Sequence, residues 1–295
     1  MTLQIADKWT DYALLDSGNG RRLERFGTLK FVRPEPQALW SYGLPEQEWE
    51  GADGVFVGKA EDSAGHWNLA TTVPSRWKMG YGNLGFWAQP SPFRHMRVFP
   101  EQAPQWDWMA DRILETKSQV SVLNLFGYTG IATLACAAAG ARVTHVDASK
   151  KVVTWARENL ELSGLSERNV RWIHDDVGRF VAREIRRQNR YDAIILDPPK
   201  YGRGPNGEIW KLEDNLGPLL YDLRLLLSDT PLFCVMTAYA VRLSALNLAH
   251  ALSEMFGGRS GAIEAGEVAL WEQSRQRPLS VAIYARFHNV SAERS

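Results

Sequence analysis

The chain has 295 residues, of which 45% are hydrophobic and 23% are charged. This composition is typical of globular domains and excludes a disordered, collagen-like or disulfide-stapled chain. The 34 basic and 34 acidic side chains cancel, which excludes a uniformly cationic nucleic-acid coat but leaves room for a local basic groove.

The first 103 residues predict a small β-rich domain. Short runs are separated by turn residues, and residues 12–16 and 22–26, joined by Ser-Gly-Asn-Gly, are typical of a β-hairpin. Eight of the 12 tryptophans lie before residue 111. Two interpretations fit them: with the neighbouring arginines they stack on and steer single-stranded RNA, or they fill the core of the domain. Residues 1–100 hold 11 acidic and 11 basic side chains, so charge does not decide between the two.

From residue 104 onward, strands and helices alternate regularly. We predict helices at 106–117, 131–139, 150–162, 177–188, 216–227 and 243–256, and strands at 120–125, 142–146, 170–173, 191–196 and 232–236. Two more strands, 264–272 and 279–287, are expected to form a closing antiparallel hairpin. Such alternation is typical of a doubly wound α/β fold. The sequence therefore predicts a β-rich domain over 1–103 and, over 104–295, a Rossmann-like domain with a mostly parallel seven-stranded sheet.

Ligands of doubly wound sheets bind beyond the carboxyl ends of the strands, so the residues after each strand are candidates. The first strand ends in a turn with two glycines, where a sharp bend lets a ligand approach the backbone at a helix N-terminus. This turn lacks the G-x-G-x-x-G pattern of dinucleotide-binding enzymes, and an ordinary strand-to-helix turn is the alternative. Its candidate cofactor-binding residues are Asn124, Phe126, Gly127, Tyr128, Thr129 and Gly130.

Carboxylates follow the second and third strands. Asp147 is suited to accept hydrogen bonds from both hydroxyls of a ribose. Asp175, Asp176 and Val177 follow the third strand, where Asp176 is suited to accept from the exocyclic amine of an adenine. Asp176 fits the N-cap of the next helix equally well.

The fourth strand is followed by the most specific motif of the chain, Asp197-Pro198-Pro199-Lys200-Tyr201. Each proline excludes helical backbone at the residue before it, so a rigid extended loop presents a carboxylate and free carbonyls in a fixed geometry. We expect Asp197 and the Pro198 carbonyl to accept hydrogen bonds from a target group. Tyr201 is expected to stack on a flat base and Lys200 to contact a phosphate, and a purely structural proline pair is the alternative.

This order of glycine turn, ribose acid, adenine acid and Asp-Pro-Pro loop resembles the class I S-adenosylmethionine (SAM)-dependent methyltransferases over about residues 104–288. Residues 98–102, 124–130 and 197–201 further resemble the bacterial large-subunit ribosomal RNA methyltransferases of the cytosine-5 and guanine-7 type. The resemblance implies SAM as the cofactor and RNA as the substrate. It also implies cofactor contacts before the first helix, here from Phe99 and Gln102, with Glu101 in place of the group's usual aspartate.

Two features depart from the cytosine-5 enzymes. The N-terminus shows no PUA-type RNA-binding domain, and Thr-Ala-Tyr stands at 237–239, where those enzymes place a nucleophilic cysteine. Cys234 lies three residues earlier in a strand expected to be buried on both faces, and Cys136 lies in an alanine-rich helix. Burial raises the pKa of a thiol, so we expect neither cysteine to be a nucleophile and favour transfer to nitrogen or oxygen.

The sequence thus favours a SAM-dependent methyltransferase that acts on RNA, with ribosomal RNA foremost. The alternatives are a methyltransferase acting on a protein or small molecule, a nicotinamide-dependent oxidoreductase, which the missing glycine pattern disfavours, and a catalytically silent RNA-binding module. Histidine and cysteine spacings predict no metal site. No apolar run resembles a signal peptide or is long enough to span a bilayer, so we expect a cytoplasmic protein without membrane contact.

Overall fold

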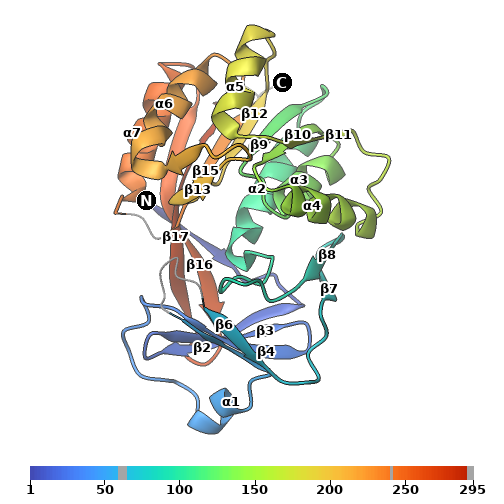
Figure 1. The fold of residues 1–295 in the computed structure, drawn as a ribbon. Coiled ribbons are helices and arrows are strands. Elements are labelled where there is room, and N and C mark those ends of the chain that lie inside the picture. The colour runs from blue at the N-terminus through green and yellow to red at the C-terminus, as the bar shows by residue number, and fades with distance from the viewer. Residues whose placement is uncertain (59–64, 240–241, 291–295) are drawn as a thin grey trace. The chain divides into compact units, whose positions relative to one another are not determined.

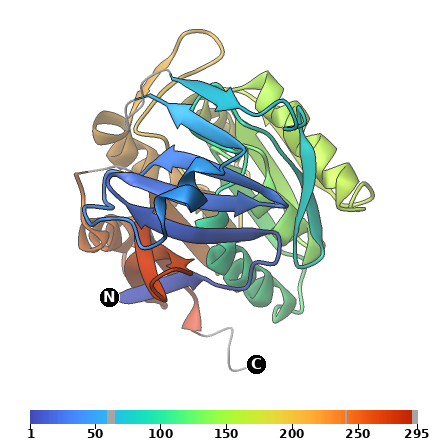
Figure 2. The same cartoon turned by 90° about the horizontal axis from the view of Figure 1, so that it is seen from below.

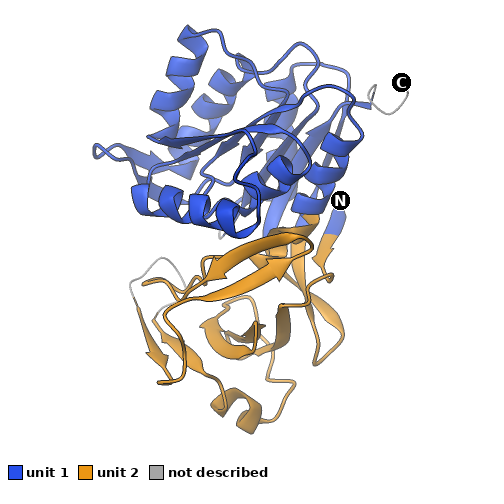
Figure 3. Ribbon diagram, turned by 90° about the vertical axis from the view of Figure 1, so that its right-hand side faces the viewer, with its two compact units in different colours: residues 1–3, 105–267, 282–295 blue, residues 4–104, 268–281 orange. Residues whose placement is uncertain are grey.

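The structure, a computed structural model, describes residues 1–58, 65–239 and 242–290. The chain divides into two compact units (Figure 3): unit 1 comprises residues 1–3, 105–267 and 282–295, and unit 2 comprises residues 4–104 and 268–281. The division expected from the sequence, at 103/104, differs from this one at Pro104 and in two short segments, 1–3 and 268–281. The second segment is the tip of the last β-hairpin, which leaves unit 1 and returns to it.

Seven strands pair across unit 1 in the order β11-β10-β9-β12-β15-β17-β16 (Figure 1). Neighbours from β11 to β15 are parallel, and β17 runs antiparallel to β15. The predicted doubly wound sheet with a closing hairpin is therefore confirmed. The strands are β9 (Ser121–Leu125), β10 (Arg142–Asp147), β11 (Val170–His174), β12 (Ala193–Leu196), β15 (Phe233–Ala238), β16 (Ala262–Glu272) and β17 (Arg277–His288).

Six helices alternate with these strands as the sequence predicts: α2 (Ala103–Leu114), α3 (Ile131–Ala138), α4 (Lys150–Leu162), α5 (Val177–Arg186), α6 (Leu212–Arg224) and α7 (Ala245–Phe256). A buried apolar cluster joins β9, β12 and β15 to α5, α6 and α7. Helix α6 begins at Leu212, four residues before the expected start, because Glu213 and Asp214 lie in its first turn, where acidic side chains are favourable. Its Pro218 lies inside the helix.

Unit 2 is rich in β-structure, as predicted. Its sheet has the order β16-β2-β3-β4-β5-β6, and β7 and β8 form a separate hairpin (Figure 2). The predicted hairpin over residues 12–26 is confirmed, with Asn19 and Gly20 in the left-handed region at its turn. The elements are β1 (Thr2–Ala6), which begins in unit 1, β2 (Tyr12–Gly18), β3 (Arg21–Phe26), β4 (Leu29–Pro34), β5 (Gly54–Val57), β6 (His66–Leu69), β7 (Trp77–Tyr81), β8 (Leu84–Ala88) and the short α1 (Glu46–Glu50).

Tryptophans of unit 2 are held by partners within the domain. The indole N–H groups of Trp9 and Trp67 donate to the carbonyls of Pro100 (2.9 Å) and Ser91 (2.7 Å), and that of Trp49 donates to the Asp16 carboxylate at 3.1 Å. Their rings pack on other aromatic side chains. Of the two interpretations left open by the sequence, the core role therefore holds for these three residues.

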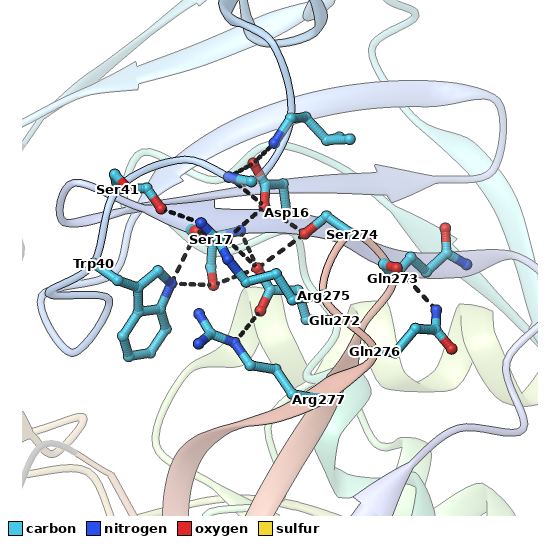
Figure 4. A network of polar contacts seen from close by, with 12 residues as sticks. Asp16, Ser17, Trp40, Ser41, Glu272, Gln273, Ser274, Arg275, Gln276 and Arg277 are labelled. Atoms are coloured by element: carbon cyan, nitrogen blue, oxygen red, sulfur yellow. Dashed lines mark hydrogen bonds and ion pairs between the residues drawn. The ribbon is translucent and has the colours of Figure 1, made fainter.

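The tip of the β16–β17 hairpin is fastened into unit 2 by a buried ionic network (Figure 4). Arg275 Nη1 lies 3.1 Å from Asp16 Oδ1 and 3.2 Å from Glu272 Oε1, and both carboxylates are fully buried. The Ser17 amide donates to Glu272 Oε1 at 2.9 Å, and Arg277 Nε donates to Glu272 Oε2 at 2.8 Å. Removing one partner from such a network costs about 3–5 kcal/mol, because a buried charge is left uncompensated. The network therefore fixes the register of the hairpin tip.

Candidate functional site

Three loops begin side by side at the carboxyl edge of the unit 1 sheet. Leu125 of β9 pairs with Val146 of β10 on one side and with Leu196 of β12 on the other. The next residues of these strands, Phe126, Asp147 and Asp197, therefore open three adjacent loops. The strand order reverses at β9, which is where ligands bind in doubly wound sheets.

The turn between β9 and α3 has an unusual backbone. Phe126 and Tyr128 have φ values of 56° and 47°, and Gly130 has a φ of 84°. Residues other than glycine rarely adopt this left-handed region, and such residues cluster at ligand-binding sites. The Gly130 amide donates to the Gly127 carbonyl at 3.0 Å, which closes the turn at the start of α3.

The two glycines of this turn make room for neighbouring side chains. A Cβ on Gly127 would lie 2.4 Å from Cε1 of His145, and a Cβ on Gly130 would lie 2.8 Å from the Ala156 Cβ. The packing of the turn on β10 and α4 therefore requires glycine at both positions, with or without a ligand. Sequence reasoning missed this role because it depends on contacts with residues far along the chain.

Asn124 and Thr129 are buried beneath the turn. The Asn124 side-chain amide donates to Thr133 Oγ1 at 2.9 Å, and the same hydroxyl lies 2.9 Å from His145 Nδ1. The fully buried His145 has a pKa lowered to about 3, because burial disfavours the charged ring. Asn124 thus supports the turn from below through a neutral hydrogen-bonded chain.

Asp147 ties the second loop to the first. Its Oδ2 accepts from the Tyr128 amide at 3.0 Å and its Oδ1 accepts from the Ser149 amide at 2.8 Å. Burial raises the pKa of the Asp147 carboxyl above its usual range, and the two amides oppose that shift. A carboxylate has about four acceptor positions, so two stay open for a pair of ligand hydroxyls.

Asp176 caps helix α5. Its Oδ1 accepts from the Arg179 amide at 3.0 Å, which is the capping role that the sequence allowed. Asp175 accepts from the Asp176 amide at 2.9 Å and forms an ion pair with Arg183. Val177 is buried in the core of unit 1. An adenine contact by Asp176 therefore stays a prediction, to be made by its other oxygen.

The Asp-Pro-Pro loop leads into a short hairpin that the sequence did not predict. Its strands are β13 (Tyr201–Arg203) and β14 (Ile209–Lys211). Asp197 is half-buried at the start of the loop, Pro198 is buried and Pro199 is exposed. The Gly-Pro-Asn-Gly run at 204–207 is a turn signal that could have revealed the hairpin.

Trp210 joins the Asp-Pro-Pro loop to the glycine turn. Its indole N–H donates to the Pro199 carbonyl at 2.7 Å, and its ring centre lies 4.7 Å from that of Phe126. The Pro199 carbonyl is therefore occupied within the protein. Trp210 is a site residue that sequence reasoning missed.

The remaining candidates lie in different places. Lys200 is half-buried and Tyr201 is 48% exposed at the base of the β13–β14 hairpin. Phe99 precedes the short 3-10 helix η1 (Pro100–Gln102), which holds Glu101 and Gln102, and all three belong to unit 2. Burial raises the pKa of the Glu101 carboxyl. The expected cofactor contacts of Phe99 and Gln102 stay predictions.

Both cysteines are fully buried, as the sequence predicts. Burial raises the pKa of both thiols, that of Cys136 to about 12. Within residues 1–58, 65–239 and 242–290, no group of three or more His, Cys, Asp or Glu residues is placed to hold a metal ion. The helices of the same described ranges include none long and apolar enough to cross a membrane.

Comparisons with known proteins agree with this geometry. The family model for conserved hypothetical protein 95 matches residues 105–214, which carry the glycine turn, the acids and the Asp-Pro-Pro loop. The chain is 39% identical over 168 residues to ribosomal RNA large subunit methyltransferase K/L of Pseudomonas paraeruginosa. This match covers 56% of the chain and 22% of the relative, so the chain spans about a fifth of that relative's length. The resemblance to large-subunit ribosomal RNA methyltransferases is therefore confirmed.

Two solved structures resemble the whole chain. The crystal structure of the SAM-dependent methyltransferase from Agrobacterium tumefaciens is 40% identical with a TM-score of 0.93, and the match covers 98% of this chain and 93% of that one. A structure described as a SAM-dependent methyltransferase from Streptococcus mutans has a TM-score of 0.72 at 15% identity, with 95% and 76% of the two chains covered. The second likeness shows the fold alone.

Proposed function

This chain belongs to the SAM-dependent methyltransferases, so its cofactor is SAM. We propose that it transfers the methyl group of SAM to RNA, with ribosomal RNA as the foremost substrate. The observation that carries the proposal is the meeting of Phe126, Asp147 and Asp197 at one edge of the sheet. The likeness to the named ribosomal RNA methyltransferase of Pseudomonas paraeruginosa supports RNA as the acceptor.

The residues around Asp147 fit the cofactor. Two of its acceptor positions hold the Tyr128 and Ser149 amides, which leaves two for the hydroxyls of the SAM ribose. These hydroxyl donors favour the charged carboxylate, which offsets the burial that raises its pKa. The other residues proposed to hold the cofactor are Phe99, Gln102, Asn124, Phe126, Gly127, Thr129, Gly130, Asp176, Val177 and Asp197.

The Asp-Pro-Pro loop fits the acceptor group. Asp197 and the Pro198 carbonyl accept hydrogen bonds from the target amine or hydroxyl, since the next carbonyl, that of Pro199, is already bound by Trp210. Tyr201 stacks on the target base and Lys200 contacts a phosphate.

Bound SAM supplies an electrophilic methyl group on a sulfonium, so the protein's task is to hold a lone pair in line with that methyl. Positive charge grows on the acceptor atom during transfer. Hydrogen bonds to the Asp197 carboxylate therefore strengthen in the transition state. Neither buried thiol is needed in this scheme, which favours a nitrogen or oxygen acceptor over carbon-5 of cytosine.

Mass spectrometry of total RNA nucleosides tests the proposal. A strain of the source organism that lacks this chain should lose one methylated nucleoside. The wild-type gene should restore that nucleoside, whereas Asp197→Ala should not. If the RNA nucleosides are unchanged and a protein or small molecule loses a methyl group instead, the substrate is that protein or small molecule and not RNA.

A further inference from the structure

The β13–β14 hairpin continues the Asp-Pro-Pro loop (Figure 1), and its outer face is formed by the side chains of Tyr201, Arg203, Ile209 and Lys211. Tyr201 pairs with Lys211 and Arg203 pairs with Ile209. Residues directly opposite in an antiparallel pair share one face, so these four side chains lie together. All four are exposed, with Tyr201 at 48% and Ile209 at 57%. The face thus combines two cations, one aromatic ring and one aliphatic side chain.

The opposite face anchors the hairpin to the candidate site. Trp210 donates to the Pro199 carbonyl at 2.7 Å and packs on Phe126. The Leu212 amide donates to the Lys200 carbonyl at 3.0 Å, which closes the base of the hairpin. At the other end, Glu208 accepts from Arg179 of α5 at 2.8 Å. These contacts hold the outer face in a fixed place next to Asp197.

The charge of the outer face fits a polyanion. The outer face contains no acidic side chain. The negative charge of the nearby Glu208 is balanced by its ion pair with Arg179. Lys211 pairs with Asp214, whose Oδ2 lies 3.7 Å from Lys211 Nζ with both side chains more than half exposed. Such an exposed pair contributes little and is readily exchanged for another anion.

We propose that this outer face binds a single-stranded RNA segment next to the target nucleotide. Arg203 and Lys211 contact phosphates of this segment, while Tyr201 stacks on the target base itself. Proteins that bind single-stranded nucleic acids combine cationic side chains along the phosphate backbone with aromatic rings on which the bases stack. The inference rests on the proposed function and adds which surface recognises the RNA.

Counterion release sets the size of the expected effect. Each phosphate contact on a single strand contributes about 0.7 to the slope of log affinity against log salt. Removing Arg203 and Lys211 should therefore reduce that slope by about 1.4. At 0.15 M salt the same two contacts correspond to roughly a tenfold loss of affinity.

The test uses the full chain and a fluorescein-labelled, mixed-sequence single-stranded RNA of about 20 nucleotides. The double variant Arg203→Gln/Lys211→Gln is compared with the control Lys151→Gln/Arg168→Gln, which removes two exposed cations from α4 and the loop before β11. Fluorescence anisotropy between 50 and 300 mM salt gives the affinity and its salt slope. The hairpin variant should show the tenfold loss and the lower slope, with SAM affinity unchanged in calorimetry, and the control should match the wild type.

Two outcomes overturn the inference in distinguishable ways. Equal RNA affinity and slope in the wild type and the hairpin variant would remove the hairpin from RNA recognition while leaving the proposed function standing. If the wild type binds a poly-glutamate peptide as tightly as the RNA, the ligand of this face is an acidic protein and not RNA. That result would overturn both proposals.

Discussion

Asp147→Ala should weaken the binding of SAM and of its demethylated product, S-adenosylhomocysteine, by about 30- to 150-fold. The carboxylate keeps two acceptor positions after binding the Tyr128 and Ser149 amides at 3.0 and 2.8 Å. Alanine removes both hydrogen bonds to the ribose, which together contribute about 2–3 kcal/mol net. The two backbone amides lose their acceptor as well, but Asp147 is half-buried, so water can replace it.

Titration calorimetry at pH 7.5 measures this loss, and Asp192→Ala is the matched control. The Asp192 Oδ2 accepts from the Ser121 amide at 2.9 Å at the amino ends of β9 and β12. That variant also loses a carboxylate–amide bond, but away from the site, so its SAM affinity should equal that of the wild type. Affinity of the Asp147 variant within about twofold of the wild type, or an equal loss in the control, would refute the assignment.

The raised pKa of Asp147 adds a dependence on pH. The ribose hydroxyls bind the charged form of the Asp147 carboxyl. At a pH where this carboxyl is protonated in the free protein, SAM binding must therefore release its proton. Affinity should therefore fall as the pH drops toward a pKa above the ordinary value of 3.8. Asp147→Asn should remove this dependence.

Three further predictions concern buried groups and the hairpin anchor. His145 should lower the unfolding free energy by about 2 kcal/mol between pH 7 and pH 5, because burial lowers its pKa to about 3 while the unfolded chain titrates near 6.5. Burial also lowers the pKa of His95 to about 3, which adds a fall of its own. The contribution of His145 is therefore the difference between wild type and His145→Gln in urea unfolding, and an equal pH dependence in the two would contradict the prediction. Cys234→Ala should keep its methyl-transfer rate within about twofold of the wild type. If the variant is folded and binds SAM but is inactive, and the wild type traps a 5-fluorocytosine RNA covalently, the thiol is the nucleophile. Trp210→Phe should keep SAM affinity but lower kcat about tenfold, because the Pro199 carbonyl loses one hydrogen bond that fixes the loop; equal kcat would show that the ring contact with Phe126 is sufficient.

Most of the unit 1 fold was readable from the sequence because its signals are local. Helix α4 is predicted to the residue, since Ser149 caps its start with a hydrogen bond from the Val152 amide and Gly164 follows its end. The central strands are apolar runs buried on both faces. The β13–β14 hairpin was missed because its three-residue strands are largely exposed and show no hydrophobic pattern.

The candidate site was partly readable for the same reason. Asp147 and Asp197 follow strands, and a parallel sheet brings such residues to one edge. The requirement for Gly127 depends on His145, which is 18 positions away, and a single sequence does not show that contact. The network that joins Ser17 to Glu272 spans 255 positions, so the excursion of the last hairpin into unit 2 was not predictable from local patterns.

Single-turnover transfer of a labelled methyl group from SAM tests the central claim most directly. The acceptor is RNA from a strain that lacks this chain, and the full-length wild type is compared with Asp197→Ala. The wild type should label the RNA, whereas Asp197→Ala should retain most of its SAM affinity and leave the RNA unlabelled. Transfer by Asp197→Ala at the wild-type rate, or label that enters only protein, would contradict the account.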